Sequence, residues 1–160
     1  MQSRVASSDG KQGEAVVESA TLEKVRAKMS DVGTPSVTVD SRALDTALDT
    51  VINSNAGISM LLVSTADGRA IAHRSLNKLD PRRLSAMSNS FLTLGETLSR
   101  ELGQTAADYV TMSTSQGSMV LVRVAADRPY TLAALGHADT SLAILLYAAR
   151  DAAARIKVLL

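Results

Sequence analysis

The chain has 160 residues, of which 46% are hydrophobic, with 17 basic and 16 acidic side chains. This length suits one domain with a substantial core, and the near-neutral charge provides no global field to hold a nucleic acid or an anionic membrane. Cysteine is absent, which excludes disulfides, thiolate nucleophiles and cysteine-based metal sites and fits a reducing compartment.

The N-terminal region is rich in Ser, Gly, Gln and charged residues and has few large apolar side chains. We therefore predict a mostly disordered extension over residues 1–38 and a folded domain over residues 39–160. One weakly amphipathic stretch, residues 14–29, is compatible with a frayed helix that a partner orders. No signal-peptide core and no run of membrane-spanning length is found, so we expect a cytoplasmic protein without membrane insertion.

A helix and a hairpin begin the folded part. In DSRALDTALDTVINSNAG, residues 40–57, apolar residues recur at helical spacing, and Asp40 or Ser41 can cap the first amides. The next stretch, ISMLLVST, is apolar on both faces, which predicts a strand covered from above and below. Because Asp67-Gly68 favours a tight turn before AIAHRS, we predict a β-hairpin directly after the helix.

The second helix is expected to begin at Asp80-Pro81, an acidic cap followed by proline, and to end at Gly103. It carries a large apolar stripe, which we expect to face the sheet: Leu84, Met87, Phe91, Leu94, Leu98 and Leu102. About 100° round the helix lies a small stripe with one leucine at its centre: Ser85, Ser88, Leu92, Gly95 and Ser99. Small side chains let another backbone approach closely, so we expect this stripe to contact a second chain rather than simply to face water.

Three further strands and a last helix follow. ADYVTMST and SMVLVRVA flank a polar turn, and YTLAALG comes after a short loop. In SMVLVRVA the valines alternate with Met119, Leu121 and Arg123, so both faces of the sheet should be covered. The start of the last helix, LAILLYAA, is apolar nearly all round, which predicts deep burial. The predicted order is α-β-β-α-β-β-β-α.

Three stretches in this order resemble the Roadblock/dynein light chain 7 family over residues 40–157: LLVSTADGRAIAH, LDPRRLSAMSNSFLTLGETLSREL and LAALGHADTSLAILLYAARDAAARI. The resemblance implies an α/β sandwich, in which a five-stranded antiparallel sheet has one helix on one face and two on the other. It also implies homodimers that pair edge strands and pack their middle helices. Such dimers are regulators or platforms for small Ras-like GTPases, and bacterial members are best known for GTPase activation in polarity and gliding control.

The residues themselves offer no catalytic constellation. The two histidines, His73 and His137, have no third nitrogen or thiolate ligand to join them, so we expect neither a metal site nor acid-base catalysis. No glycine-rich phosphate-binding loop is present. We therefore expect a protein that is not an enzyme, has no catalytic residues and needs no cofactor.

The function predicted first is a non-enzymatic homodimeric regulator or scaffold for a small Ras-like GTPase, with GTPase activation as one mode of action. The alternative is a sensory or adaptor dimerisation domain in a signalling complex without a GTPase. Arg82, Arg83 and Arg100 would either contact the acidic groups of a partner or remain solvated. The predicted dimer interface consists of Ser85, Ser88, Leu92, Gly95, Ser99, Tyr109, Val110, Thr111, Met112 and Ser113.

Overall fold

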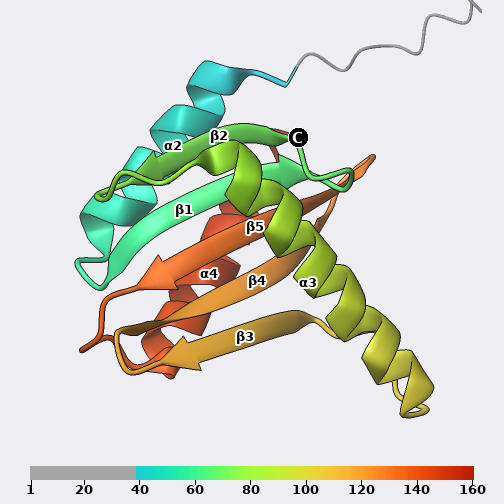
Figure 1. Cartoon of the computed structure of the whole chain (residues 1–160). Helices are drawn as coiled ribbons and strands as arrows, with labels where there is room; N and C mark the ends of the chain where they lie inside the picture. Colours follow the sequence, from blue (N-terminus) through green and yellow to red (C-terminus); the bar gives the residue numbers. More distant parts are fainter. Residues whose placement is uncertain (1–38) are drawn as a thin grey trace, which may run out of the picture. The chain divides into compact units, whose positions relative to one another are not determined.

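A five-stranded antiparallel sheet is the centre of the computed structural model, which describes residues 39–160 (Figure 1). The elements in chain order are α2 (Ser41–Ser54), β1 (Ile58–Thr65), β2 (Ala70–Ser75), α3 (Pro81–Glu101), β3 (Tyr109–Thr114), β4 (Gly117–Ala125), β5 (Pro129–Gly136) and α4 (Leu142–Lys157). The strand order is β2-β1-β5-β4-β3, and all neighbours are antiparallel. This confirms the predicted order of elements and the α/β sandwich. The predicted disorder of residues 1–38 and the helix over 14–29 lie outside the described residues.

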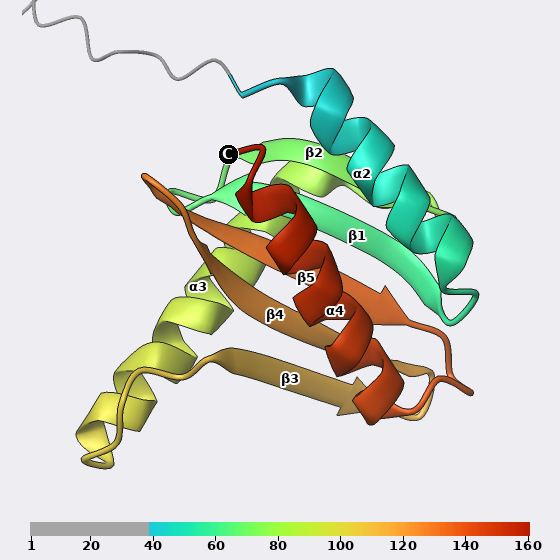
Figure 2. The ribbon, with the colours of Figure 1, turned by 180° about the vertical axis from the view of Figure 1, so that it is seen from behind.

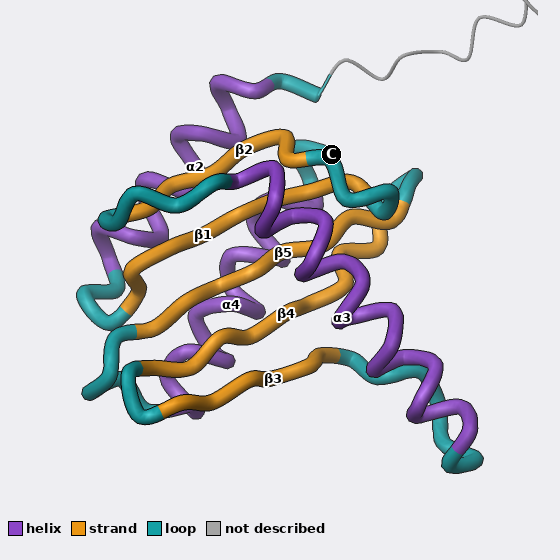
Figure 3. Tube along the Cα trace, in the orientation of Figure 1, coloured by secondary structure: helices purple, strands orange, loops and turns teal. Residues whose placement is uncertain are grey.

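Helices cover both faces of the sheet. α2 and α4 lie side by side on one face (Figure 2), and α3 crosses the other face diagonally (Figure 3). The larger core lies beneath α2 and α4 and includes Val120, Val122 and Val124 of β4. The smaller core lies beneath α3 and consists of Met60, Leu62, Leu92, Leu121 and Ala133. The predicted alternation of β4 between two covered faces is therefore confirmed.

Both predicted helix starts are confirmed by their caps. The carboxylate of Asp40 accepts hydrogen bonds from the backbone N–H groups of Arg42 at 3.0 Å and Ala43 at 3.2 Å. The carboxylate of Asp80 accepts in the same way from Arg82 at 3.0 Å, and Pro81 occupies the first turn of α3. These bonds satisfy N–H groups that have no partner within the helix. The caps therefore determine where each helix begins against the sheet.

The deep burial predicted for the start of α4, LAILLYAA, holds for only one side of the helix. Leu145, Ala148, Ala149, Ala152 and Ile156 are buried, but Ile144 is 57% and Tyr147 75% exposed. A helix that packs on one side of a sheet buries only the side it presents to that sheet. The alanines of α4 let its backbone approach the sheet closely, Leu145 packs in the core beside them, and Ile144 and Tyr147 point to solvent.

Candidate interaction surface

α3 contacts the sheet mainly through its small stripe, and of its large apolar stripe only Leu84 packs against the core beneath it. Ser85 and Leu92 are fully buried, and Ser88 is 4% exposed. The expectation that the large apolar stripe faces the sheet is therefore wrong. We predicted that Ser85, Ser88 and Leu92 contact a second chain, but they pack inside their own chain and are not available to it. Ser99, from the same stripe, is half-buried.

Gly95 shows why small residues are needed on this side of α3. A Cβ atom at this position would overlap Cγ2 of Val110 on β3. The helix and the strand thus approach each other so closely that glycine fits without strain, whereas alanine would require Val110 to shift. The small stripe was predicted to let the backbone of a second chain approach closely; at Gly95 the group that comes close is the Val110 side chain of the same chain.

The hairpin turn between β1 and β2 anchors the N-terminal half of α3. The Ser85 hydroxyl donates to the carbonyl oxygen of Gly68 at 2.6 Å, and the Asn89 amide donates to the carbonyl oxygen of Ala66. Gly68 has φ +81° and lies against the Cα atom of Ala86, so a side chain at this turn would be strained and crowded. The Asp67-Gly68 turn therefore holds α3 in position as well as reversing the chain.

A partly buried ion pair that was not predicted holds the middle of α3. Two nitrogens of Arg123 on β4 donate to the two carboxylate oxygens of Glu96 on α3, each at 2.9 Å. The same guanidinium donates to Asn89 at 3.1 Å and to Thr131 at 2.9 Å. The Arg123 and Glu96 side chains are only 20% and 16% exposed. The one available signal was a lone arginine among the apolar residues of a strand with two covered faces.

The large apolar stripe is consequently exposed along α3. Met87 is 59%, Leu94 64%, Leu98 58% and Leu102 68% exposed, and Phe91 is 38% exposed. Single exposed apolar side chains are common, but a continuous row along one helix is typical of an interaction surface. Only Leu84, at the N-terminal end of the stripe, packs on the smaller core.

A groove runs beside the N-terminal half of this stripe, between α3 and the sheet. It has a volume of about 420 Å³ and lies between the N-terminal half of α3 and the ends of β3, β4 and β5. Its lining is apolar except for one serine and consists of Met60, Leu79, Leu84, Met87, Ser88, Phe91, Met112, Met119 and Leu135. The exposed stripe, the groove and β3 therefore form one continuous surface.

β3 forms an edge of the sheet, as the predicted interface requires. Within residues 39–160 it pairs with β4 alone, and therefore its other side offers unpaired N–H and C=O groups. Tyr109 and Met112 are 38% and 45% exposed, and the Arg150 guanidinium of α4 lies 5.3 Å from the centre of the Tyr109 ring. Such an edge is a template for pairing with another strand.

A Roadblock/LC7 domain model matches residues 44–132, which is more than half of the chain. The chain belongs to the Roadblock/LC7 domain family. Its fold is similar to that of MglB from Myxococcus xanthus, with a TM-score of 0.66 at 11% identity, over 75% of this chain and 89% of that one. The gliding protein mglB from Thermus thermophilus gives a TM-score of 0.65 at 11% identity, over 74% and 89% of the two chains.

A Roadblock/LC7 domain from Streptomyces avermitilis is also similar, with a TM-score of 0.64 at 13% identity, over 71% of this chain and 94% of that one. At such low identities these likenesses show the fold alone. No curated protein matches the sequence. The function of this Roadblock domain must therefore be argued from its own surface.

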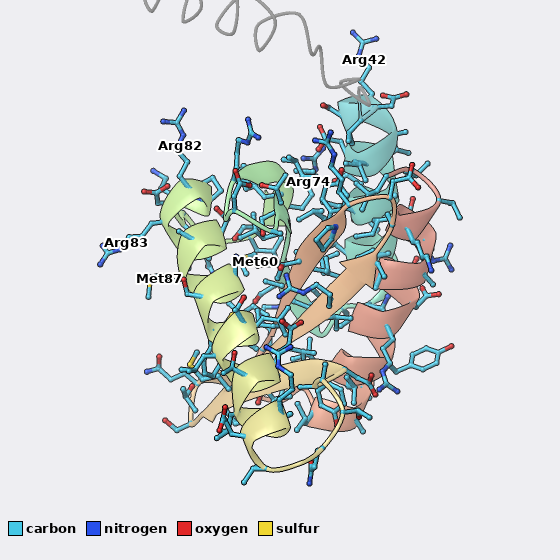
Figure 4. The ribbon with its side chains drawn as sticks, turned by 90° about the vertical axis from the view of Figure 1, so that its right-hand side faces the viewer. Arg42, Met60, Arg74, Arg82, Arg83 and Met87 are labelled. Atoms are coloured by element: carbon cyan, nitrogen blue, oxygen red, sulfur yellow. The ribbon has the colours of Figure 1, made fainter. Side chains whose placement is uncertain are left out.

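The predicted partner-contacting arginines lie at the two ends of α3. Arg82 and Arg83 are exposed and point away from the sheet at the N-terminal end, as Figure 4 shows. Arg100 is exposed near the C-terminal end, where it donates to the Thr97 hydroxyl at 3.3 Å. The structure does not bring these three arginines together within one chain. They flank the exposed stripe at opposite ends.

The histidines and acidic residues of the described part of the Roadblock domain are dispersed. Residues 39–160 contain no group of three or more His, Cys, Asp or Glu side chains placed to hold a metal ion. His73 is exposed on β2, whereas His137 is half-buried beyond β5, where its backbone N–H donates to Gly57. No helix in this range combines the length and the apolar character needed to cross a membrane.

Proposed function

We propose that this Roadblock/LC7 domain forms a homodimer that regulates or scaffolds a small Ras-like GTPase. The observation that carries the proposal is the continuous surface of exposed α3 stripe, groove and unpaired β3 edge. A two-fold axis at the β3 edge would pair β3 with its copy and bring the two α3 stripes into contact. Such an isologous contact closes the exposed edge on both chains at once.

The apolar side chains of the proposed contact can offset most of the free-energy cost of association. Burying a Leu, Met or Phe side chain completely contributes roughly 1.5–3 kcal/mol. Five such side chains per chain are already partly buried, so ten of them would contribute on the order of 10 kcal/mol. Association costs roughly 4–15 kcal/mol in lost rigid-body freedom. The apolar contact alone thus comes close to balance, and we expect strand pairing to supply part of the net affinity.

The exposed arginines of α3 support the binding of a further, acidic partner protein to the dimer. If the two α3 helices pack antiparallel, Arg82 and Arg83 of one copy lie towards Arg100 of the other, with cations at both ends of the paired helices. Cations at the rim of an interface mainly steer the encounter with an acidic partner and make its rate depend on salt. The family resemblance makes a Ras-like GTPase the expected partner. The domain would then act on the catalytic residues of the GTPase rather than perform chemistry itself.

Binding to a small Ras-like GTPase from the same organism tests the proposal. The GTPase is loaded with a GTP analogue or with GDP, and association is followed for the wild type and for Arg82→Glu/Arg83→Glu. We expect preference for the GTP form and association of the double variant slowed several-fold, with the dimer intact. Arg128→Glu, a charge reversal in the β4–β5 loop, is the matched control and should bind normally.

Single-turnover GTP hydrolysis with and without the domain separates activation from scaffolding. An increased rate would assign GTPase activation, whereas tight binding at an unchanged rate would assign a scaffold. Negligible binding of the wild type to both nucleotide states would reject the GTPase and favour the adaptor alternative.

A further inference from the structure

Methionines from four different elements meet in the groove between α3 and β3. Met60 comes from β1, Met87 from α3, Met112 from β3 and Met119 from β4, and all four line the groove. They are all the methionines of residues 39–160. No two of them are neighbours in the sequence, so it is the fold that concentrates the thioethers at this surface.

Two of these thioether side chains are open to solvent and two are protected. Met87 is 59% and Met112 45% exposed, whereas Met60 is 3% exposed and Met119 is half-buried. The chain has no cysteine and no tryptophan, so methionines are its most readily oxidised side chains, and Met1 and Met29 are the two that lie outside the described residues. Thioethers are the groups that peroxides convert to sulfoxides, and accessibility determines which ones react first.

We propose that the groove is a peroxide-sensitive modification site, in which oxidation of Met87 and Met112 to methionine sulfoxide prevents assembly of the dimer. This inference rests on the proposed dimer and adds a means of regulating it. In the reaction the sulfur lone pair attacks one oxygen of hydrogen peroxide, an S–O bond forms and the O–O bond breaks. The sulfur loses two electrons, the peroxide is reduced, and the second oxygen leaves as water after proton transfer.

The sulfoxide harms the assembly more than the fold. In the free chain the sulfurs of Met87 and Met112 lie at the surface, where water can solvate a sulfoxide oxygen. In the dimer the same oxygen would be buried in a groove whose only polar side chain is Ser88. The Ser88 hydroxyl can donate to one sulfoxide oxygen at most, so the other would be a buried acceptor without a donor, which is unfavourable, and the apolar contact of the thioethers is lost as well. The two-fold axis doubles the effect, because each chain brings both methionines.

Assembly in turn protects the methionines. Once the stripe and the groove are covered, peroxide reaches Met87 and Met112 only when the dimer dissociates. The modification therefore acts on free chains and keeps them apart. Sulfoxide reduction by a methionine sulfoxide reductase, which uses thiols as the reductant, would restore the thioethers and hence the dimer.

The test compares the full-length wild type with Met87→Leu/Met112→Leu before and after limited treatment with hydrogen peroxide. Leucine keeps the apolar volume but cannot be oxidised. Peptide mass spectrometry locates the added oxygen, and light scattering over a dilution series gives the dimer dissociation constant. In the wild type we expect oxygen at Met87 and Met112 before Met60 and Met119, and a dissociation constant raised by about tenfold or more.

The leucine variant is compared with itself: whatever its dissociation constant before treatment, peroxide should leave that constant unchanged, and far-ultraviolet circular dichroism should be unchanged in both proteins. Incubation of the oxidised wild type with a sulfoxide reductase should restore the dimer. The inference is overturned if the oxidised wild type dimerises as before, or if peroxide dissociates the leucine variant equally. Either result would leave the proposal of a dimer unaffected. A chain that is monomeric before any treatment would reject both the proposed dimer and this inference.

Discussion

Gly95→Ala is the most informative single substitution, because two opposing effects are known for it. In an isolated helix alanine is more favourable than glycine by about 1 kcal/mol. In this structure the added methyl group would overlap Cγ2 of Val110, and overpacking of this kind costs roughly 1–3 kcal/mol. Since Val110 is β-branched and sits on a paired strand, it has little freedom to move aside. We therefore expect a net loss of up to about 2 kcal/mol in the free energy of unfolding.

Val110→Ala provides the matched partner for a double-mutant cycle. It removes the Cγ2 atom that the new methyl group would meet, so Gly95→Ala in this background should regain the helix-propensity gain of about 1 kcal/mol. The coupling energy between the two positions should be roughly 1–3 kcal/mol. The assay is urea unfolding followed by circular dichroism, at one protein concentration for all four proteins because dimerisation adds to the measured stability. Additive effects, with Gly95→Ala stabilising on its own, would refute the close approach of α3 to β3.

Three further predictions test the fold around this surface. Glu96→Ala should lower the unfolding free energy by about 2 kcal/mol because it leaves Arg123 partly buried without its carboxylate, and Glu96→Met/Arg123→Met should lose less than the sum of the single changes in urea unfolding. Removal of residues 1–36 should leave a cooperative thermal transition close to that of the full chain, and loss of that transition would show that the segment docks on the domain. The Thr65 hydroxyl donates to Asp67 and lowers the pKa of its carboxyl below the ordinary value, so the stabilisation is present at neutral pH and is lost as the pH falls through the folded-state pKa. Asp67→Asn should therefore be less stable than the wild type at neutral pH in thermal melts, with the difference shrinking in acid.

The element order was predictable because its signals are local. The caps at Asp40 and Asp80 and the turn at Asp67-Gly68 act within a few residues. The alternation in β4 is also a property of one strand. Each of these features depends on neighbouring residues, and the structure places each where the sequence indicated.

The orientation of α3 was not predictable from periodicity. Periodicity shows that α3 has two stripes about 100° apart, but either could face a sheet. The choice depends on the other side of the contact. Beneath α3 the sheet already provides Met60, Leu62 and Leu121, so the buried side of the helix holds one large side chain, Leu92, between small ones. Serine, leucine and glycine fit there, and the hydroxyl of Ser85 finds an acceptor at Gly68. Those partners come from distant parts of the sequence.

The candidate surface differs from the predicted one for the same reason. The prediction that β3 is an edge strand is confirmed. It followed from the family resemblance, which implies the order of the strands in the sheet. The contribution of α3 was assigned to the wrong side, so Leu94 and its neighbours replace the small stripe in the proposed dimer. The Arg123–Glu96 pair was missed because no local pattern links a strand arginine to a glutamate on another element.

The oligomeric state of the full-length chain tests the central claim most directly. Light scattering at micromolar concentration should give twice the chain mass for the wild type and the single chain mass for Leu94→Glu, which places a charge in the middle of the exposed stripe. Tyr147→Glu introduces the same charge at an exposed position of α4, on the face of the sheet opposite to α3, and this variant should remain a dimer. A monomeric wild type, or a Leu94→Glu variant that keeps the dimer mass, would contradict the proposed dimer through α3 and β3.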